Sequence, residues 1–211
     1  DLNMSPSHNL IERAMLDLRR DRMKTVDAIL STKMFAAVQT SNYVYPGDPS
    51  QSLTTDNSAF TSQSDRTVDV ETLQRSAKVL KDLGIPTFAN GRYMAILSTR
   101  QVLNIKSSNG YQRLARYFPE KNPLFTNYVA SVDNIDIFEC ATNPTATANS
   151  TITVQLGLVF GPGFVGYASA KPCEVLAADD TNFGRRVSVI WSAWEGSAVM
   201  DDRFAVTVRS D

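Results

Sequence analysis

Residues 68–86 read VDVETLQRSAKVLKDLGIP, and this stretch carries the clearest structural signals in the chain. Asp69 can cap the first turn of a helix, and Gly84 suits a left-handed helix terminus. Pro86 then prevents the helix from continuing. The apolar residues between these signals recur on one helical face: Val70, Leu73, Ala77, Leu80 and Leu83. The pattern therefore predicts an amphipathic helix over 69–83.

The segments around this helix also have interpretable patterns. Upstream, residues 5–39 have helical apolar spacing, in one piece or in two. Between them, the polar residues 41–68 predict a long loop or extended connection, a kind of segment that often reaches a partner. Downstream, 92–98 reads as a buried strand, and 99–120 reads as two short helices separated by Ser108, Asn109 and Gly110.

From about residue 128 the apolar residues alternate with period two, which is typical of strands. The alternation is weak over 131–140 and strong over 151–160. Residues 185–194 and 203–210 repeat it, and the turn-like segment 195–202 between them predicts a hairpin. Helices followed by mostly antiparallel strands indicate the α+β fold class.

Composition excludes several kinds of function. The chain has 211 residues, of which 43% are hydrophobic and 20% charged, with a formal net charge of −1. This balance predicts a globular protein with no general attraction to nucleic acid or to an anionic membrane. Residues 140–170 carry no charge, but their prolines, glycines and polar residues predict no membrane-spanning helix.

A glycine motif, GPGFVG at 161–166, follows the strand-like stretch 151–160. Gly161, Gly163 and Gly166 have the G-x-G-x-x-G spacing of dinucleotide-binding loops, so a dinucleotide-binding enzyme is one alternative function. That chemistry needs a helix directly after the glycines. Pro172 leaves too little chain for such a helix, so the glycines are predicted to shape a strand end and a return to a neighbouring strand.

No other pattern predicts a catalytic, cofactor-binding or metal site. His8 is the single histidine, and Cys140 and Cys173 are interpreted as two free, buried thiols. Two pairs of adjacent carboxylates are interpreted as solvated loop residues: Asp179 with Asp180, and Asp201 with Asp202.

A basic cluster lies in the first predicted helix: Arg19, Arg20, Arg22 and Lys24. These residues could bind phosphate, which would make the chain a nucleic-acid-binding module. Asp17 and Asp21 interleave with them, however, and favour a solvated or subunit-contacting helix face.

Two passages, 67–99 and 154–211, together resemble the major capsid proteins of tailed bacteriophages, which have the HK97 fold. The resemblance is greatest to the coat proteins of podovirus-type and cyanobacterial phages. It implies an icosahedral shell subunit around double-stranded DNA, with an encapsulin-like protein nanocompartment as an alternative. The first 67 residues match only in general character.

The resemblance further implies two domains and a set of partners. Residues 69–98 and 171–211 would form a peripheral domain with a long spine helix and an antiparallel sheet. Residues 99–170 would form the axial domain, and 1–68 an N-terminal helix with an arm or loop. The implied partners are other copies in pentamers and hexamers, portal, scaffolding and possibly decoration proteins, and DNA held by non-specific contact. The implied location is the virion, after assembly in the host cytoplasm.

Overall fold

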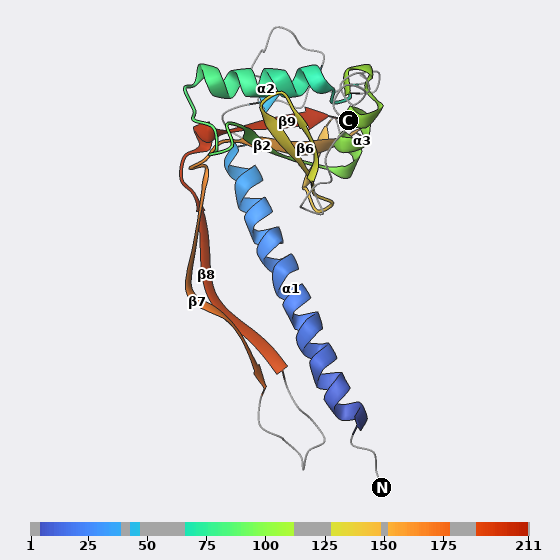
Figure 1. Ribbon diagram of the computed structural model, residues 1–211, viewed down its shortest axis with the longest axis vertical. Coiled ribbons are helices and arrows are strands. Elements are labelled where there is room, and N and C mark those ends of the chain that lie inside the picture. Colours follow the sequence, from blue (N-terminus) through green and yellow to red (C-terminus); the bar gives the residue numbers. More distant parts are fainter. Residues whose placement is uncertain are drawn as a thin grey trace. The chain divides into compact units, whose positions relative to one another are not determined.

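The computed structural model describes residues 5–38, 43–46, 66–111, 128–148, 152–177 and 189–210. Its helices are α1 (Ser5–Val38), α2 (Val70–Asp82) and α3 (Thr99–Ser107), and all three lie where helices are predicted (Figure 1). The first is one continuous helix rather than two pieces. The second short helix predicted before residue 120, and most of the connection 41–68, lie outside the described residues.

The strands in the described residues form a larger and a smaller sheet. The larger has the order β1-β9-β6-β2-β4-β3, and β5 pairs with β6 beside this path; the smaller contains β7 and β8. Their bounds are β1 (Tyr43–Val44), β2 (Tyr93–Leu97), β3 (Tyr128–Val132), β4 (Ile135–Glu139), β5 (Thr145–Ala148), β6 (Ile152–Phe160), β7 (Val165–Ala177), β8 (Val189–Val199) and β9 (Ala205–Ser210). The α+β class is confirmed, although β1–β9 and β2–β4 are parallel pairs.

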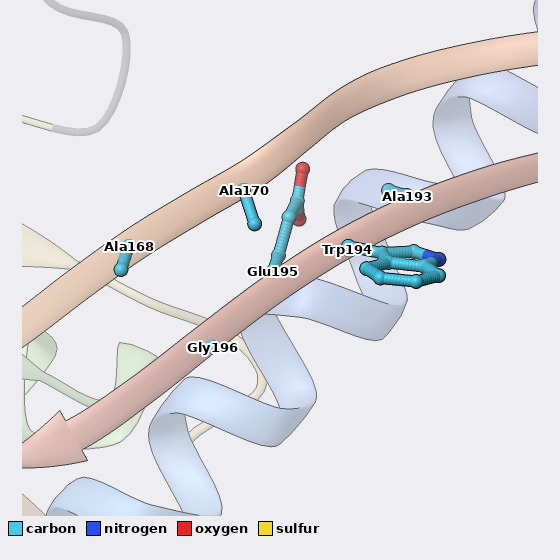
Figure 2. Close-up of a pocket in the computed structure, with 6 residues that line it drawn as sticks. All are labelled: Ala168, Ala170, Ala193, Trp194, Glu195 and Gly196. Carbon is cyan, nitrogen blue, oxygen red and sulfur yellow. The ribbon is translucent and has the colours of Figure 1, made fainter.

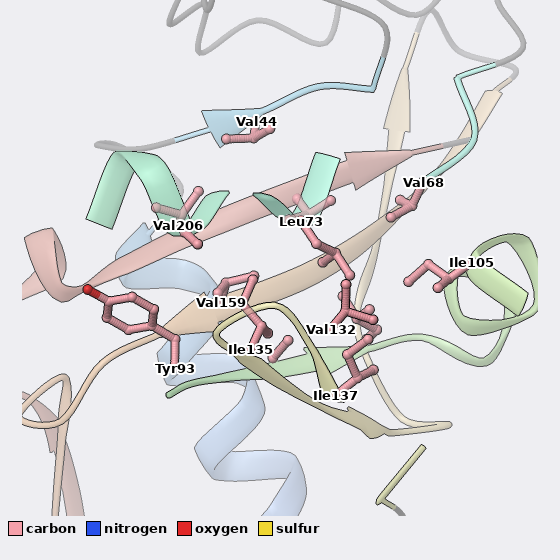
Figure 3. Packing of buried hydrophobic residues seen from close by; sticks show 14 of the residues in the cluster. Val44, Val68, Leu73, Tyr93, Ile105, Val132, Ile135, Ile137, Val159 and Val206 are labelled. Atoms are coloured by element: carbon pink, nitrogen blue, oxygen red, sulfur yellow. The ribbon is translucent and has the colours of Figure 1, made fainter. Parts of the chain in front are cut away.

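Helix α2 forms for the reasons its sequence predicts. The Asp69 carboxylate accepts a hydrogen bond from the Thr72 N–H at 2.9 Å, and Gly84 has a φ of +69° just beyond the helix. The apolar face of the helix packs on the larger sheet, mainly on β9. Leu73 is buried there among residues of several strands, including Ile135 and Val159 (Figure 3).

The weakly alternating stretch 131–140 is not one strand but parts of two. Strand β3 ends at Val132 and β4 begins at Ile135, and the two pair antiparallel. Asp133 has a φ of +52°, so the chain reverses at this residue. The alternation continues through the reversal because the turn contains polar residues at positions that an extended strand would also expose.

The predicted hairpin between 185–194 and 203–210 is wrong. Strand β8 continues through the predicted turn to Val199 and pairs with β7. Strand β9 instead lies between β6 and β1, with Thr207 opposite Leu158 and Tyr43. All six residues of β9 are buried, which requires neighbours on both edges and both faces, and one partially exposed hairpin partner could not provide these.

The chain divides into two compact units, and helix α1 contributes to both. The helix–hairpin unit comprises residues 1–30 and 166–198, and the sheet unit comprises 31–165 and 199–211. The predicted domain ranges do not follow this division, because they place the C-terminal strands with α2 in one domain. The sheet unit contains both clusters of buried apolar residues that the described part of the chain shows.

Candidate interaction surface

The glycine motif shapes a turn between two strands and does not begin a helix. Strand β6 ends at Phe160, and β7 begins at Val165. Gly163 has a φ of +89°, and the Gly161 N–H donates to the Phe204 carbonyl at 3.0 Å. Strand β7 pairs with β8, so the expectation that it returns beside β6 is wrong. The glycines therefore lack the helix N-terminus that a dinucleotide site requires.

The remaining candidate residues do not come together. Cys140 and Cys173 are free thiols as predicted, but both are partly exposed rather than buried. Asp201 caps a short 3₁₀ helix, Asp202–Phe204, and its hydrogen bonds from Arg203 lower its pKa. The side chain of His8 and the pair at 179–180 lie outside the described residues.

The described residues contain no group of three or more His, Cys, Asp or Glu side chains placed to hold a metal ion. In the same part of the chain, no helix combines the length and the apolar character needed to cross a membrane.

A polar cluster joins α1 to the hairpin formed by β7 and β8. Arg22 on α1 donates to the carboxylate of Glu195 on β8, and the Tyr167 hydroxyl on β7 donates to the same carboxylate. The hydrogen bond from Arg22 is the main reason why the pKa of Glu195 is lowered, and the bond from Tyr167 lowers it further. Three elements of the helix–hairpin unit thus meet at one carboxylate.

The basic cluster of α1 is divided by this arrangement. Arg22 is directed to the hairpin, while Arg20 lies near Asp17 on the exposed helix surface, with 3.9 Å between its Nη1 and the carboxylate. Next to Arg22, Asp21 accepts a hydrogen bond from the Trp191 indole N–H at 3.4 Å. These contacts support the predicted contact role for part of the cluster, and nothing in the sequence identifies Arg22 as its distinct member.

Acidification is expected to loosen the hairpin from α1. Because the pKa of Glu195 in the folded chain lies below its ordinary value of 4.5, its contribution is present above pH 4.5. The contribution is lost as the pH falls through the lowered pKa. Both tryptophans, Trp191 and Trp194, lie in β8, so their fluorescence reports on this unit. We expect the Glu195→Gln variant to show a fluorescence signal that depends less on pH in this range.

Glu174→Gln is the matched control for that measurement. Glu174 also lies on the hairpin and pairs with Lys171 at 2.9 Å, but it makes no printed contact with α1 and is half exposed. Its variant should keep the acid transition of the unchanged chain. Equal pH profiles for Glu195→Gln and the unchanged chain would contradict the assignment.

The helix–hairpin unit has no core of its own among its described side chains. From 12 to 30 on α1, and over 166–176 and 189–198 on the hairpin, every described side chain is at least partly exposed. A unit of this kind has little buried apolar surface to offset the entropy of ordering its chain. Surface from elsewhere is therefore needed to complete it.

Exposed large apolar side chains are concentrated on the same unit. Seven of the ten in the described residues belong to it: Leu16, Met23, Ile29, Tyr167, Leu176, Ile190 and Trp194. Beside Trp194 lies an open hollow of about 460 Å³ between β7 and β8 (Figure 2). Exposed apolar surface on this scale is typical of a protein interaction site.

Comparisons with known proteins give matches only at the level of structure. No protein-family model matches the chain, and no curated protein matches it. The capsid of Ralstonia phage GP4 matches with a TM-score of 0.61 and 12% identity, over 82% of this chain and 52% of that one. A chain from Mycobacterium phage Che8 gives 0.57 and 14%, over 93% and 62%. The head of Helicobacter pylori bacteriophage KHP40 gives 0.59 and 12%, over 98% and 72%.

These likenesses show the fold. The chain has the α+β fold of phage capsid proteins, as the resemblance in its sequence predicts. It spans about 62% and 52% of the length of the Che8 and GP4 chains.

Proposed function

We propose that this chain is a bacteriophage major capsid protein that assembles with copies of itself into an icosahedral shell around double-stranded DNA. The observation that carries the proposal is the helix–hairpin unit, which is compact yet buries none of its described side chains. In a chain with a capsid-protein fold, neighbouring copies would supply the missing cover.

The two compact units suggest how the domains of a shell subunit are distributed. The helix–hairpin unit combines the longest described helix, α1, with two strands that run in opposite directions (Figure 1). A long helix with an antiparallel sheet is the composition expected of a peripheral domain. We therefore assign that role to the helix–hairpin unit and the axial role to the sheet unit, in place of the predicted ranges.

The proposed partners are other copies in pentamers and hexamers, together with portal and scaffolding proteins and a possible decoration protein. Contact with the packaged DNA would be non-specific, which the net charge of −1 permits without a dedicated basic surface. The shell would assemble in the host cytoplasm and remain in the virion. No catalytic step is assigned to the chain.

Electron microscopy of the expressed full chain, with any upstream residues and scaffolding protein supplied, tests the proposal. We expect closed icosahedral particles. A protein that stays monomeric under all these conditions would overturn the proposal. The contents of the particles separate the two shell functions, because nuclease-protected DNA indicates a phage capsid and enclosed protein indicates a nanocompartment.

A further inference from the structure

The hairpin has an inner face toward α1 and an outer face away from it. Trp191 and Glu195 on β8 contact α1, and successive side chains of a strand point to opposite faces. Alternate residues of β8 therefore point outward, and on β7 the residues alternating with Tyr167 do the same. We define the outer hairpin face by Ala168, Ala170, Leu176, Ile190, Trp194 and Gly196.

This face is apolar and highly exposed. Trp194 is 70% exposed, Ile190 57% and Leu176 45%. The charged Glu174 shares the face, but its carboxylate is paired with Lys171. An indole exposed to this degree on a strand has few contacts within the chain, and tryptophan is among the residues that contribute most to protein interfaces.

The hollow beside Trp194 makes the face concave at its centre. Ala168 and Ala170 on β7 form one side of it, and Trp194 and Gly196 on β8 form the other (Figure 2). A Cβ atom added at Gly196 would meet nothing within 4 Å. The hollow is thus open to a side chain from outside and is not needed for packing within the chain.

The size of the face indicates a folded protein as its occupant. Two strands about 4.8 Å apart and about 11 residues long present a face on the order of 400 Å². A standard interface covers about 800 Å² on each partner, so apolar surface beside the hairpin must contribute. Leu16 and Met23, exposed on α1 of the same unit, offer such surface. A second copy carries both parts, so one copy can present to the other what the other lacks.

We propose that the outer hairpin face, with Trp194 at its centre, docks on a second copy of this chain, and that the hollow receives an apolar side chain of that copy. The proposal rests on the proposed shell function and specifies one of its contacts. It makes Trp194 the anchor of the interface and Gly196 a position that must stay small.

The experiment measures the protein concentration needed for assembly of the full chain and three variants, by sedimentation velocity. Trp194→Ala removes the anchor, and Gly196→Leu fills the hollow without a clash inside the chain. We expect both to raise the required concentration about 30-fold or more. Leu103→Ala is the matched control, because Leu103 is 64% exposed on α3 of the sheet unit, and it should assemble like the unchanged chain.

A second measurement follows Trp194 directly. In Trp191→Phe, Trp194 is the single tryptophan, and its emission should shift to shorter wavelengths on assembly because the indole leaves water. The folds of all variants are compared by circular dichroism, and Trp194→Ala should retain the spectrum of the unchanged chain.

The outcomes separate the two proposals. Failure of the unchanged chain to assemble would overturn both. Assembly of Trp194→Ala and Gly196→Leu at the normal concentration, or an unshifted Trp194 emission in assembled particles, would overturn the docking surface and leave the shell function standing. An equal loss in Leu103→Ala would show that apolar surface in general drives assembly, and it would overturn the assignment to this face.

Discussion

Replacing Leu80 by alanine is expected to lower the free energy of unfolding by about 2–5 kcal/mol. Leu80 is 0% exposed, in the middle of the cluster that α2 forms with the larger sheet. Truncation to alanine removes apolar contacts and leaves a cavity that rigid neighbours fill only in part. Chemical denaturation of the unassembled chain, followed by far-ultraviolet circular dichroism, measures the loss.

Leu83→Ala is the control on the same helix. Leu83 follows the last turn of α2 and is 49% exposed, so little packing is lost. We expect a change of less than about 1 kcal/mol. Similar losses in the two variants would show that the face of α2 is not packed as the structure places it.

Replacing Gly161 by alanine is expected to destabilise the sheet unit by about 1–3 kcal/mol. An added Cβ atom would lie 2.8 Å from Cγ2 of Ile85 and 2.9 Å from the carbonyl oxygen of Pro86. The second of these is backbone and cannot turn away, so the chain after α2 or the end of β6 must shift. The same denaturation measurement quantifies the effect.

Gly110→Ala is the matched glycine control in the same unit. Its added Cβ atom would lie 3.4 Å from Cγ2 of Val70, which is an ordinary contact, and Gly110 does not have a positive φ. Alanine should therefore be neutral or slightly stabilising there. Equal destabilisation at both positions would contradict the close approach assigned to Gly161.

The signals that predict α2 are local, which is why they suffice. Asp69 caps a residue three positions away, and Gly84 adopts the left-handed conformation at the residue where it is needed. The strand that becomes β6 is likewise recognisable from its own alternation. Local signals fail when a turn imitates a strand, as at Asp133 within the weakly alternating stretch.

The candidate surface depends on contacts that no local pattern contains. Arg22 and Glu195 are 173 positions apart, and the sequence around Arg22 resembles that of its neighbours Arg19 and Arg20. The exposure of Trp194 is equally hidden, because a tryptophan in an alternating strand reads as a core residue. Its orientation follows from which face of the hairpin α1 covers.

Residues buried for polar reasons are also out of reach of pattern analysis. Gln101 on α3 reads as a surface residue, yet it is fully buried, and its amide nitrogen donates to the carbonyls of Gln155 and Val208, each at 3.2 Å. A Cβ atom at Gly157 would lie 2.6 Å from Oε1 of Gln101. The glycine in β6 is thus required by a side chain more than fifty residues away.

The sequence by itself determined the α+β class, the positions of α2, β2 and β6, and the resemblance to phage capsid proteins, because turns, caps and alternation act within a few residues. Only the tertiary structure decided that β7 pairs with β8, that β9 lies between β6 and β1, and that the helix–hairpin unit buries none of its described side chains. Strand partners and exposed faces depend on which distant segments exclude water together, and that is a property of the folded chain as a whole.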